Sequence, residues 1–295
     1  MISITTCPIC NLERFERFLK IKDHSISGEY FNLELCASCR FIITSPRPDT
    51  EQLGTYYQSE NYISHSDTNT GLVNKIYRRI RQFTIKQKIA LIRKLHQNPK
   101  LLDIGSGAGY FLNECQAQGF HCFGIEPDFN TRSNSVNKFN INVFDEVYMN
   151  QIPAESIDVI TMWHVLEHVP ELNKRLEEIR KILKQNAYLI IAVPNCNSFD
   201  ASYYKEYWAG YDVPRHLWHF TPETITNLLS HYSFLHVETK PMYFDAYYVA
   251  MLSEKYKGNL AGLARGFVTG FISNAIAFFS KNNRYSSQIY IFRKQ

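Results

Sequence analysis

The sequence predicts an α/β protein built on a doubly wound, mostly parallel, seven-stranded sheet. Two observations carry this prediction. From residue 101 onward, short apolar segments alternate with amphipathic segments of helical period, which is the pattern of parallel strands joined by crossover helices. The first two apolar segments are also separated by a glycine-rich turn. With 295 residues, 45% hydrophobic and 20% charged, the chain has the composition of an ordinary globular protein with a sizeable core.

The unit that organises the rest of the chain runs from Leu101 to Glu126. It predicts a strand at 101–104, a helix at 110–117 and a second strand at 121–125. Three glycines lie in the turn after the first strand: Gly105, Gly107 and Gly109. Glycines let the backbone approach a ligand, and a carboxylate at the tip of the second strand accepts hydrogen bonds from a ribose diol. The unit therefore predicts a nucleoside-type ligand.

The residues around the turn discriminate between two cofactors. A dinucleotide fingerprint would need a glycine at Tyr110, so that pattern is broken. Instead, Asp103 lies two residues before the first glycine. The pattern of two apolar residues, Asp, apolar, Gly-x-Gly-x-Gly resembles motif I of the class I S-adenosylmethionine-dependent methyltransferases. The resemblance implies that Asp103 and the three glycines surround the methionine part of the cofactor, and that Glu126 holds its ribose hydroxyls.

Five further apolar segments complete the predicted sheet: 141–144, 157–162, 188–193, 235–237 and 288–292. Ligands bind beyond the carboxyl ends of such strands. After 157–162 the chain reads MWHVLEHV, which resembles the corresponding motif of small-molecule methyltransferases of the ubiquinone-biosynthesis type. That resemblance implies that Trp163 and His164 touch both cofactor and acceptor. Trp163 can equally be a core residue, and His168 can be a helix residue that satisfies a backbone carbonyl.

Two further strand ends bear on the ligands. Asp145 or Glu146 follows the third strand, where relatives place a polar residue near the adenine, but both can also be exposed loop acids. The fifth strand ends in VPNCN. It lacks the N/D-P-P-Y/F/W motif of amino-group methyltransferases, which orients an exocyclic amine. We therefore expect O- or C-methyl transfer in preference to N-methyl transfer.

An insertion at about 196–222 precedes the helix predicted at 222–231. It is rich in aromatic residues and holds His216 and His219. Dense aromatic residues can wall an organic acceptor, and either histidine can act as a general base. HLWHF resembles the H-x-x-Y-F segment of sugar C-methyltransferases, which implies a base at His216, while His219 replaces a tyrosine. His164 is a third candidate. The alternative is an aromatic lid whose histidines are structural.

The first 60 residues predict a small zinc ribbon. The pairs Cys7–Cys10 and Cys36–Cys39 are both CxxC, and two such turns provide the four thiolates of a closed tetrahedral zinc site with a folding role. The sugar C-methyltransferases also carry such a four-cysteine zinc domain. The alternative is a chance or redox pair. Four of seven cysteines in CxxC pairs, and no secretory signal pattern at the N-terminus, predict a cytoplasmic location.

Residues 61–98 predict a polar loop, Ser64 to Thr70, followed by a basic helical linker. Eight Lys and Arg residues lie between Lys75 and Lys94 without an acid among them. The simplest interpretation is a solvated helix packed on the following domain. The alternative is a phosphate-facing surface for nucleotide, RNA or anionic lipid.

The segment 259–280 predicts an apolar helix near the end of the chain. Packing against the core or against a second subunit, as in a homo-oligomer, is the favoured interpretation. Interfacial attachment to a membrane, close to a lipid-linked substrate, is the alternative.

Together these patterns predict three parts: a zinc ribbon (1–60), a basic linker (61–98) and a methyltransferase domain (99–295). The resemblance implies S-adenosylmethionine as cofactor, and we expect a small-molecule acceptor, with a sugar or nucleotide-sugar favoured. One alternative is an RNA base methyltransferase, because some of those enzymes join a cysteine zinc module to this fold. A second is a protein that binds the cofactor without turnover.

Overall fold

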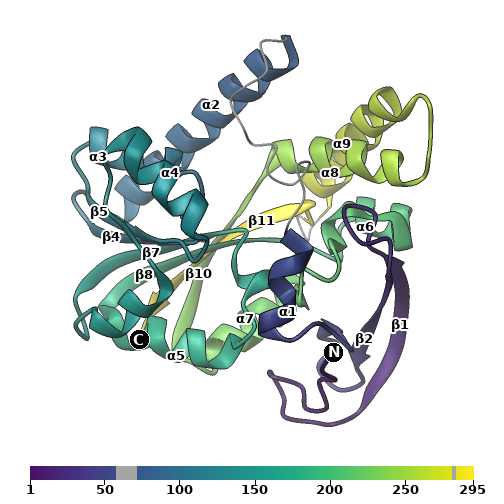
Figure 1. Cartoon of the computed structure of the whole chain (residues 1–295), viewed down its shortest axis with the longest axis horizontal. Coiled ribbons are helices and arrows are strands. Elements are labelled where there is room, and N and C mark those ends of the chain that lie inside the picture. The colour runs from purple at the N-terminus through teal and green to yellow at the C-terminus, as the bar shows by residue number, and fades with distance from the viewer. Residues whose placement is uncertain (58–71, 281–283) are drawn as a thin grey trace.

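Two sheets organise the computed structural model, which describes residues 1–57, 72–280 and 284–295 (Figure 1). The larger has seven strands in the order β10-β11-β8-β7-β4-β5-β6. The contacts β8-β7-β4-β5-β6 are all parallel, whereas β11 runs antiparallel to both of its neighbours. The predicted fold class is therefore confirmed. The strands are β4 (Lys100–Ile104), β5 (His121–Ile125), β6 (Val143–Phe144), β7 (Ile157–Trp163), β8 (Leu183–Pro194), β10 (Phe234–Pro241) and β11 (Ser287–Lys294).

Helices cover both faces of this sheet, as in a doubly wound fold (Figure 1). One apolar core joins α2 and α3 to one face, and another joins α5 and α7 to the opposite face. Both cores form because each helix presents a stripe of apolar residues at helical spacing. The helices are α2 (Leu72–Leu95), α3 (Tyr110–Ala117), α4 (Phe129–Phe139), α5 (Leu172–Ile182) and α7 (Pro222–Ser230). The loop predicted at 64–70, and with it the predicted boundary near residue 60, lies outside the described residues.

The smaller sheet contains the N-terminal strands and one strand from the insertion. Its order is β1 (Phe15–Lys22), β2 (Tyr30–Cys36), β3 (Ile42–Thr44) and β9 (Trp218–His219), all antiparallel. Residues 42 and 43 pair with residues 219 and 218. The N-terminal unit and the insertion therefore share one sheet, so the segment that carries both predicted base candidates is held by the first 45 residues of the chain. The division into three parts stays a prediction.

The aromatic residues of the insertion form a core of their own. Tyr204, Trp208 and Tyr211 are each at most 2% exposed, and they pack with Phe31 and Leu33 of the smaller sheet. Tyr204 ends the short helix α6 (Phe199–Tyr204), and Trp208 and Tyr211 follow it; the N-terminal part contributes another short helix, α1 (Thr50–Leu53). The expectation that these residues wall an acceptor pocket is corrected for these three, because their rings are buried in this core.

A helical hairpin projects from the C-terminal part of the chain (Figure 1). It consists of α8 (Tyr243–Tyr256) and α9 (Gly262–Phe279). By length and composition alone, α9 is long and apolar enough to cross a membrane, and it is the one such helix among the described residues. The favoured interpretation is packing on the core or on a second subunit; packing on the core is wrong for its large apolar side chains, and a second subunit stays a prediction. Leu263, Phe267 and Phe271 are 76%, 59% and 60% exposed.

Candidate functional site

The glycine-rich turn folds over the tips of β4 and β5. The backbone N–H groups of Gly105 and Ser106 both donate to the carbonyl of Ile125, at 2.7 and 3.1 Å. Glu126 then accepts from the N–H of Gly107 at 2.8 Å and from the N–H of Asp128 at 3.0 Å. All three glycines have positive φ. These bonds fix a buried carboxylate beside a loop in which three of five residues lack a side chain.

Asp103 lies beneath this loop, near the tip of β4. Its carboxylate accepts from the Thr161 hydroxyl of β7 at 2.6 Å and is 2% exposed. Burial raises the pKa of Asp103 to about 7, although Thr161 and Lys88 both favour the charged form. Lys88, from α2, lies with its Nζ 4.0 Å from the centre of the Trp163 ring, and burial lowers its pKa to about 8. Each of these two groups favours the charged form of the other, although burial opposes both charges.

The space around the turn fits a polar, nucleoside-like cofactor. A methyl group added at Gly107 would meet nothing within 4 Å, whereas one at Gly105 would lie 2.4 Å from Val165. Ser106 Oγ and Trp163 Nε1 are buried without a hydrogen-bond partner among the described residues. Buried polar atoms are normally paired, so these two mark positions at which a ligand supplies the missing partners. Glu126, with two backbone donors already, retains acceptor capacity for a diol.

His164 follows β7 in an unusual backbone conformation. Its φ of +57° places a non-glycine residue in the left-handed region, which is a recurrent feature of functional sites. Its Nδ1 lies 3.3 Å from Glu167 and its Nε2 lies 3.0 Å from Asp245 of α8. Desolvation opposes the charge on the ring, but the two carboxylates outweigh it and raise the pKa of His164 to about 10. The two carboxylates thus favour the protonated ring of His164.

Glu167 connects His164 with a second pair of histidines. One ligand atom each from Glu167, His168 and His216 lies within 4.8 Å of the other two. The rings of His168 and His216 are 4.5 Å apart between centres. Nδ1 of His168 lies 3.0 Å from the carbonyl of Arg215, and Nδ1 of His216 lies 2.9 Å from that of Gly210. Because a carbonyl only accepts, these contacts place the proton of each ring on Nδ1, and a neutral ring then keeps its lone pair on Nε2. In His168 the same N–H is shared with the Tyr57 hydroxyl, which also lies 3.0 Å from Nδ1.

His219, the other base candidate of the insertion, occupies a different environment. It lies in β9, is 4% exposed, and its Nε2 lies 2.9 Å from the hydroxyl of Thr44 in β3. Burial and the neighbouring His216 hold its pKa well below the ordinary value. The structure therefore brings His164 and His216 together through Glu167, and gives His219 a partner in the smaller sheet. The predicted roles of all three stay predictions.

A buried ion-pair network holds the segment that presents His216. Arg215 is 1% exposed and donates to Asp212 at 2.7 Å and to Asp23 at 2.9 Å. Asp23 also accepts from the backbone N–H groups of Ser25 and Ser27, at 3.0 and 2.9 Å. Arg215 thereby joins the hairpin between β1 and β2 to the insertion.

Other predicted residues have structural partners. Glu146 forms an ion pair with Arg175 of α5, and Asp145 precedes it at an exposed turn. Asn195, at the tip of β8, donates to the carbonyl of Tyr285 at 3.1 Å and accepts from the N–H of Asn197 at 3.0 Å.

The four paired cysteines converge at one point. Cys7 Sγ lies 3.5 Å from Cys39 Sγ, and Cys10 Sγ lies 3.4 Å from Cys36 Sγ. Four sulfurs around a tetrahedral zinc ion, at Zn–S of about 2.3 Å, are separated by about 3.8 Å. The cluster is compatible with such an ion, since the thiols are all free.

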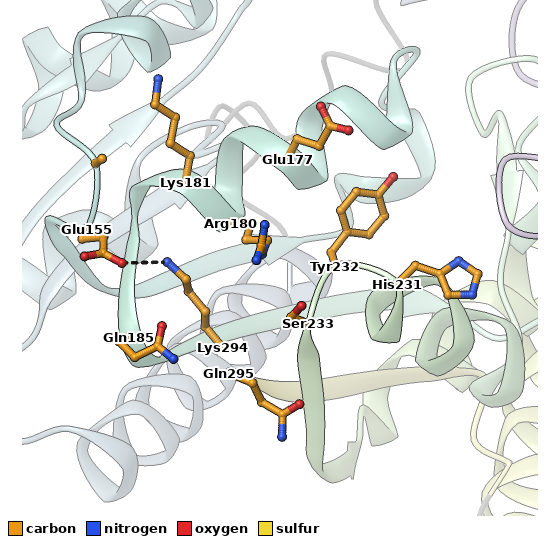
Figure 2. Close-up of a pocket in the computed structure, with 11 residues that line it drawn as sticks. Glu155, Glu177, Arg180, Lys181, Gln185, His231, Tyr232, Ser233, Lys294 and Gln295 are labelled. Atoms are coloured by element: carbon orange, nitrogen blue, oxygen red, sulfur yellow. Dashed lines mark hydrogen bonds and ion pairs between the residues drawn. The ribbon is translucent and has the colours of Figure 1, made fainter.

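A hollow of about 660 Å³ lies elsewhere, between α5 and the ends of β10 and β11 (Figure 2). Arg180, Lys181, Lys294 and His231 line it, together with Glu155 and Glu177, so its charges are mixed. It includes Gln185, near the start of β8, and therefore sits at the edge of the sheet opposite the glycine-rich turn. We do not place the reaction there.

Three contributing residues were not predicted. Lys88 had a signal, because it lies on the same helical stripe as Ile85, Ile89 and Ile92. Glu167 belongs to the MWHVLEHV motif, but no role was predicted for it. Asp245 had no local signal, because its contact with His164 joins positions 81 residues apart.

Comparison with known proteins agrees with this geometry. Residues 77–238, more than half of the chain, match the family model described as a methyltransferase domain. No curated protein matches the sequence. The fold is similar to a SAM-dependent methyltransferase from Archaeoglobus fulgidus, with 20% identity and a TM-score of 0.50 over 72% of this chain and 94% of that one. It is also similar to phosphoethanolamine N-methyltransferase 2 from Haemonchus contortus, with 14% identity and a TM-score of 0.50 over 71% of this chain and 52% of that one.

Proposed function

Since the chain belongs to the methyltransferase-domain family, we propose that it transfers a methyl group from S-adenosylmethionine to an oxygen or carbon atom of a small hydroxylated molecule. The cofactor, when bound, supplies a methyl group activated by a sulfonium centre. Glu126 would hold its ribose, and the turn containing Gly107 would hold its methionine part. A sugar or nucleotide-sugar is the favoured acceptor.

The observation that carries this proposal is the cluster formed by Glu167, His168 and His216 beside His164. It lies directly after β7, on the side of the sheet where the cofactor residues gather. Both histidines of the pair keep the Nε2 lone pair, because each Nδ1 donates to a backbone carbonyl. A hydroxyl, or a carbon acid beside a ketone, must lose a proton for transfer to be completed, and this cluster offers groups to receive it. Positioning of the two reactants supplies much of the remaining rate.

The end of β8 supports transfer to oxygen or carbon. Amino-group methyltransferases use the side chain at this tip to accept protons from an amine. Here the amide of Asn195 is engaged by Tyr285, Gln288 and Asn197. Its oxygen already receives a backbone N–H, so it is poorly placed to orient an exocyclic amine. The similarity to an N-methyltransferase, at 14% identity, concerns the fold alone.

The basic helix α2 supports a small molecule over RNA. Several of its cations are turned toward the protein. Lys88 lies over Trp163, Arg81 stacks on Tyr110 with 3.6 Å to the ring centre, and Arg93 donates to the carbonyl of Gln118. RNA binding through this helix would depend strongly on salt concentration. An RNA substrate predicts that replacing the outward residues Lys75, Arg78, Lys86 and Lys94 with Ala abolishes both RNA retention and turnover.

We propose a structural zinc ion for the four-cysteine cluster. All four ligands would be thiolates, so the site would have no open position for a reacting group. Purified protein should contain one zinc per chain at this cluster. Absence of metal from protein purified under reducing conditions would contradict the assignment.

The cofactor part of the proposal is tested by calorimetry with S-adenosylmethionine. We expect heat of binding with the wild type and a loss of affinity of about 10- to 100-fold in Glu126→Ala, which corresponds to about 1.4–2.7 kcal/mol. Asp128→Ala, which removes an exposed neighbouring carboxylate, is the matched control. Identical titrations for wild type and Glu126→Ala would refute the assignment.

The reaction is tested with methyl-labelled cofactor and a panel of nucleotide-sugars. His216→Ala should lower turnover by at least about 100-fold while cofactor affinity changes by a few-fold, because the lost group acts on the acceptor. His231→Ala, in the distant hollow of Figure 2, is the control. An unchanged rate in His216→Ala would remove this residue from the mechanism. Binding of cofactor without transfer to any acceptor would favour the binding-protein alternative.

A further inference from the structure

The carboxylate of Glu167 lies buried beside two histidines and has few partners. It is 1% exposed, and neither oxygen has a hydrogen bond among the described residues. An ionised carboxylate in such a position needs a cation or several donors. His164 provides one, at 3.3 Å from Oε1, but that imidazolium is shared with Asp245. Glu167 therefore has unused capacity to coordinate a positive charge.

The two histidines are oriented as metal ligands usually are. In metal sites, a ligating imidazole donates its other ring N–H to a carbonyl or carboxylate, which fixes both the tautomer and the ring direction. His168 and His216 each meet this condition, with Nδ1 to carbonyl distances of 3.0 and 2.9 Å. Their Nε2 atoms are the nitrogens left to bind. The carbonyls that orient them belong to Arg215 and Gly210, on either side of Asp212 in the chain.

The charges around the cluster favour a cation. Four carboxylates lie in this part of the molecule: Asp23, Asp212, Glu167 and Asp245. Arg215 is shared by Asp23 and Asp212, His164 is shared by Glu167 and Asp245, and the charge of Lys88 also acts on Asp245. A divalent ion at the cluster would place further positive charge beside Glu167, in a region where water provides little screening.

We propose that Glu167, His168 and His216 form a second metal site, separate from the four-cysteine cluster, that takes a divalent first-row transition ion such as Mn²⁺, Fe²⁺, Co²⁺ or Zn²⁺. Two histidines and one carboxylate leave coordination positions open, and these are suited to oxygen atoms of a hydroxylated acceptor. The site deepens the proposed function, because a cation lowers the pKa of a hydroxyl that it binds. The proton would then leave to solvent and would not have to reside on an imidazole.

Cobalt distinguishes this site from the cysteine cluster by its absorption. Full-length protein is stripped of metal with a chelator under reducing conditions and titrated with Co²⁺. Occupation of the four thiolates gives intense charge-transfer absorption in the near ultraviolet. A nitrogen and oxygen site gives only weak bands in the visible region. The wild type should bind two equivalents, and Glu167→Gln and His216→Ala should each weaken the second by at least about 100-fold while leaving the thiolate absorption unchanged.

Controls and outcomes keep the two proposals apart. His231→Ala should bind two equivalents, and circular dichroism of each variant establishes that it is folded. One equivalent in the wild type would overturn the metal site. If His216→Ala still abolished methyl transfer in that case, His216 would act as a general base and not as a metal ligand. Two equivalents without transfer to any acceptor would support the metal site and refute the proposed reaction.

A second, independent observation concerns α9, whose amphipathicity is inverted. Its buried residues are small or polar: Gly262, Gly266, Thr269, Gly270, Ser273 and Ala277. Its exposed residues are large and apolar: Leu263, Phe267, Val268, Phe271, Ile272, Ile276, Phe278 and Phe279. A helix of a soluble monomer normally shows the opposite arrangement. Large apolar residues gathered on one exposed helix face are typical of a surface that binds a protein or a membrane.

The inner face explains why this arrangement is stable. A methyl group added at Gly266 would lie 2.4 Å from the Met251 backbone, and one added at Gly270 would lie 2.8 Å from that of Tyr247. The two glycines allow α8 and α9 to touch along their backbones, as small residues do in helix pairs that face lipid. One face of α9 packs on α8, and its large apolar residues lie on the other face.

Charge identifies the occupant of this surface. The exposed ionic groups of the hairpin are cationic: Lys255, Lys257 and Arg265. Its two acids face inward, since Asp245 pairs with His164, and Glu254 is 1% exposed and accepts from the Tyr204 hydroxyl. A second copy would bring cations against cations, whereas anionic lipid would attract them. We infer that the outer face of α9 docks in the plane of an anionic membrane surface.

Co-sedimentation with vesicles tests this inference. The wild type should pellet with vesicles of phosphatidylcholine mixed with phosphatidylglycerol, less with phosphatidylcholine alone, and less at high salt. Leu263→Ser/Phe271→Ser should lose most of the bound fraction. Phe129→Ser, which removes an exposed ring from α4, should bind as the wild type does. Absence of vesicle binding would overturn the inference, and sedimentation velocity showing a dimer that the double variant dissociates would assign the face to a second copy.

Discussion

The two halves of the site are assembled in different ways. The cofactor half comes from one contiguous stretch, Leu101 to Glu126, whose backbone bonds close the turn on itself. The acceptor half collects residues from distant parts of the chain. His216 comes from the insertion, Glu167 follows β7, Asp245 begins α8, and Asp23 anchors the network from the N-terminal sheet. The first half is therefore stable wherever the central sheet forms, whereas the second requires the smaller sheet to be docked.

The substitution with the largest expected effect on this difference is Arg215→Ala. The substitution leaves the buried Asp23 and the partly buried Asp212 without their shared cation, and breaking such a network costs about 3–5 kcal/mol of unfolding free energy. Urea denaturation measures the loss, and calorimetry with S-adenosylmethionine should still find affinity within a few-fold of the wild type. Arg284→Ala removes a partly exposed ion pair to Glu223 and should change stability by less than about 1 kcal/mol. A wild-type denaturation midpoint for Arg215→Ala would show that the network does not hold the acceptor half.

The next effect concerns the pH dependence of the cofactor half. Burial raises the pKa of Asp103 to about 7, above its value in the unfolded chain, so the folded protein binds this proton more tightly. Stability of the cofactor-free protein should therefore fall as pH rises from about 4 to about 7, by at most about 1.4 kcal/mol per pH unit from this group. Asp103→Asn keeps an oxygen for Thr161 and removes the titration. The melting temperature of the variant should exceed that of the wild type, and the difference should grow between pH 5 and pH 8.

Asp158→Asn is the control with the opposite sign. Although burial opposes its charge, bonds from Lys184 and from the Lys100 backbone hold the pKa of Asp158 below the ordinary value. The carboxylate therefore contributes stability above its unfolded pKa, and that contribution is lost in acid. The Asp158→Asn variant should be less stable than the wild type at pH 8 and approach it at low pH. Parallel pH profiles for wild type and Asp103→Asn would contradict the pKa assigned to Asp103.

The comparison also explains which features could be predicted from sequence. The strands of the large sheet follow from alternating apolar and helical segments, because each signal lies within about ten residues. The glycine-rich turn and Glu126 could be placed for the same reason. By contrast, β9 is a two-residue strand that pairs with β3 more than 170 positions earlier, and no local pattern identifies such a partner.

Burial in the insertion shows a second limit to what can be predicted from the sequence. A run containing Tyr204, Trp208 and Tyr211 has the composition of a ligand wall and of a hydrophobic core alike. Only the location of the smaller sheet decides between them, and it buries all three rings. Similarly, the face of α9 is apolar by sequence, but the sequence does not tell whether that face turns in or out. Composition identifies a side chain's chemistry, and long-range contacts decide its environment.

The smallest effects separate two glycines within the cofactor half. Gly107 and Gly109 both have positive φ, +53° and +77°, so an alanine at either position costs about 1–2 kcal/mol in backbone strain. At Gly109 the new methyl would also lie 2.6 Å from Ile141 and 2.9 Å from Ser135, which adds overpacking of about 1 kcal/mol or more. At Gly107 it would meet open space. Thermal denaturation should therefore show the greater loss of stability in Gly109→Ala.

Cofactor affinity should follow the reverse order. The methyl of Gly107→Ala projects from the loop that we assign to S-adenosylmethionine, beside the N–H that holds Glu126, and it should weaken binding by about 10-fold or more. Gly109→Ala points its methyl toward α4 and Ile141, away from that space, so calorimetry at a temperature where both variants are folded should find a smaller loss. If Gly109→Ala lost more affinity than Gly107→Ala, the open side of Gly107 would not be the cofactor surface, and the contact would have to lie on another part of the turn.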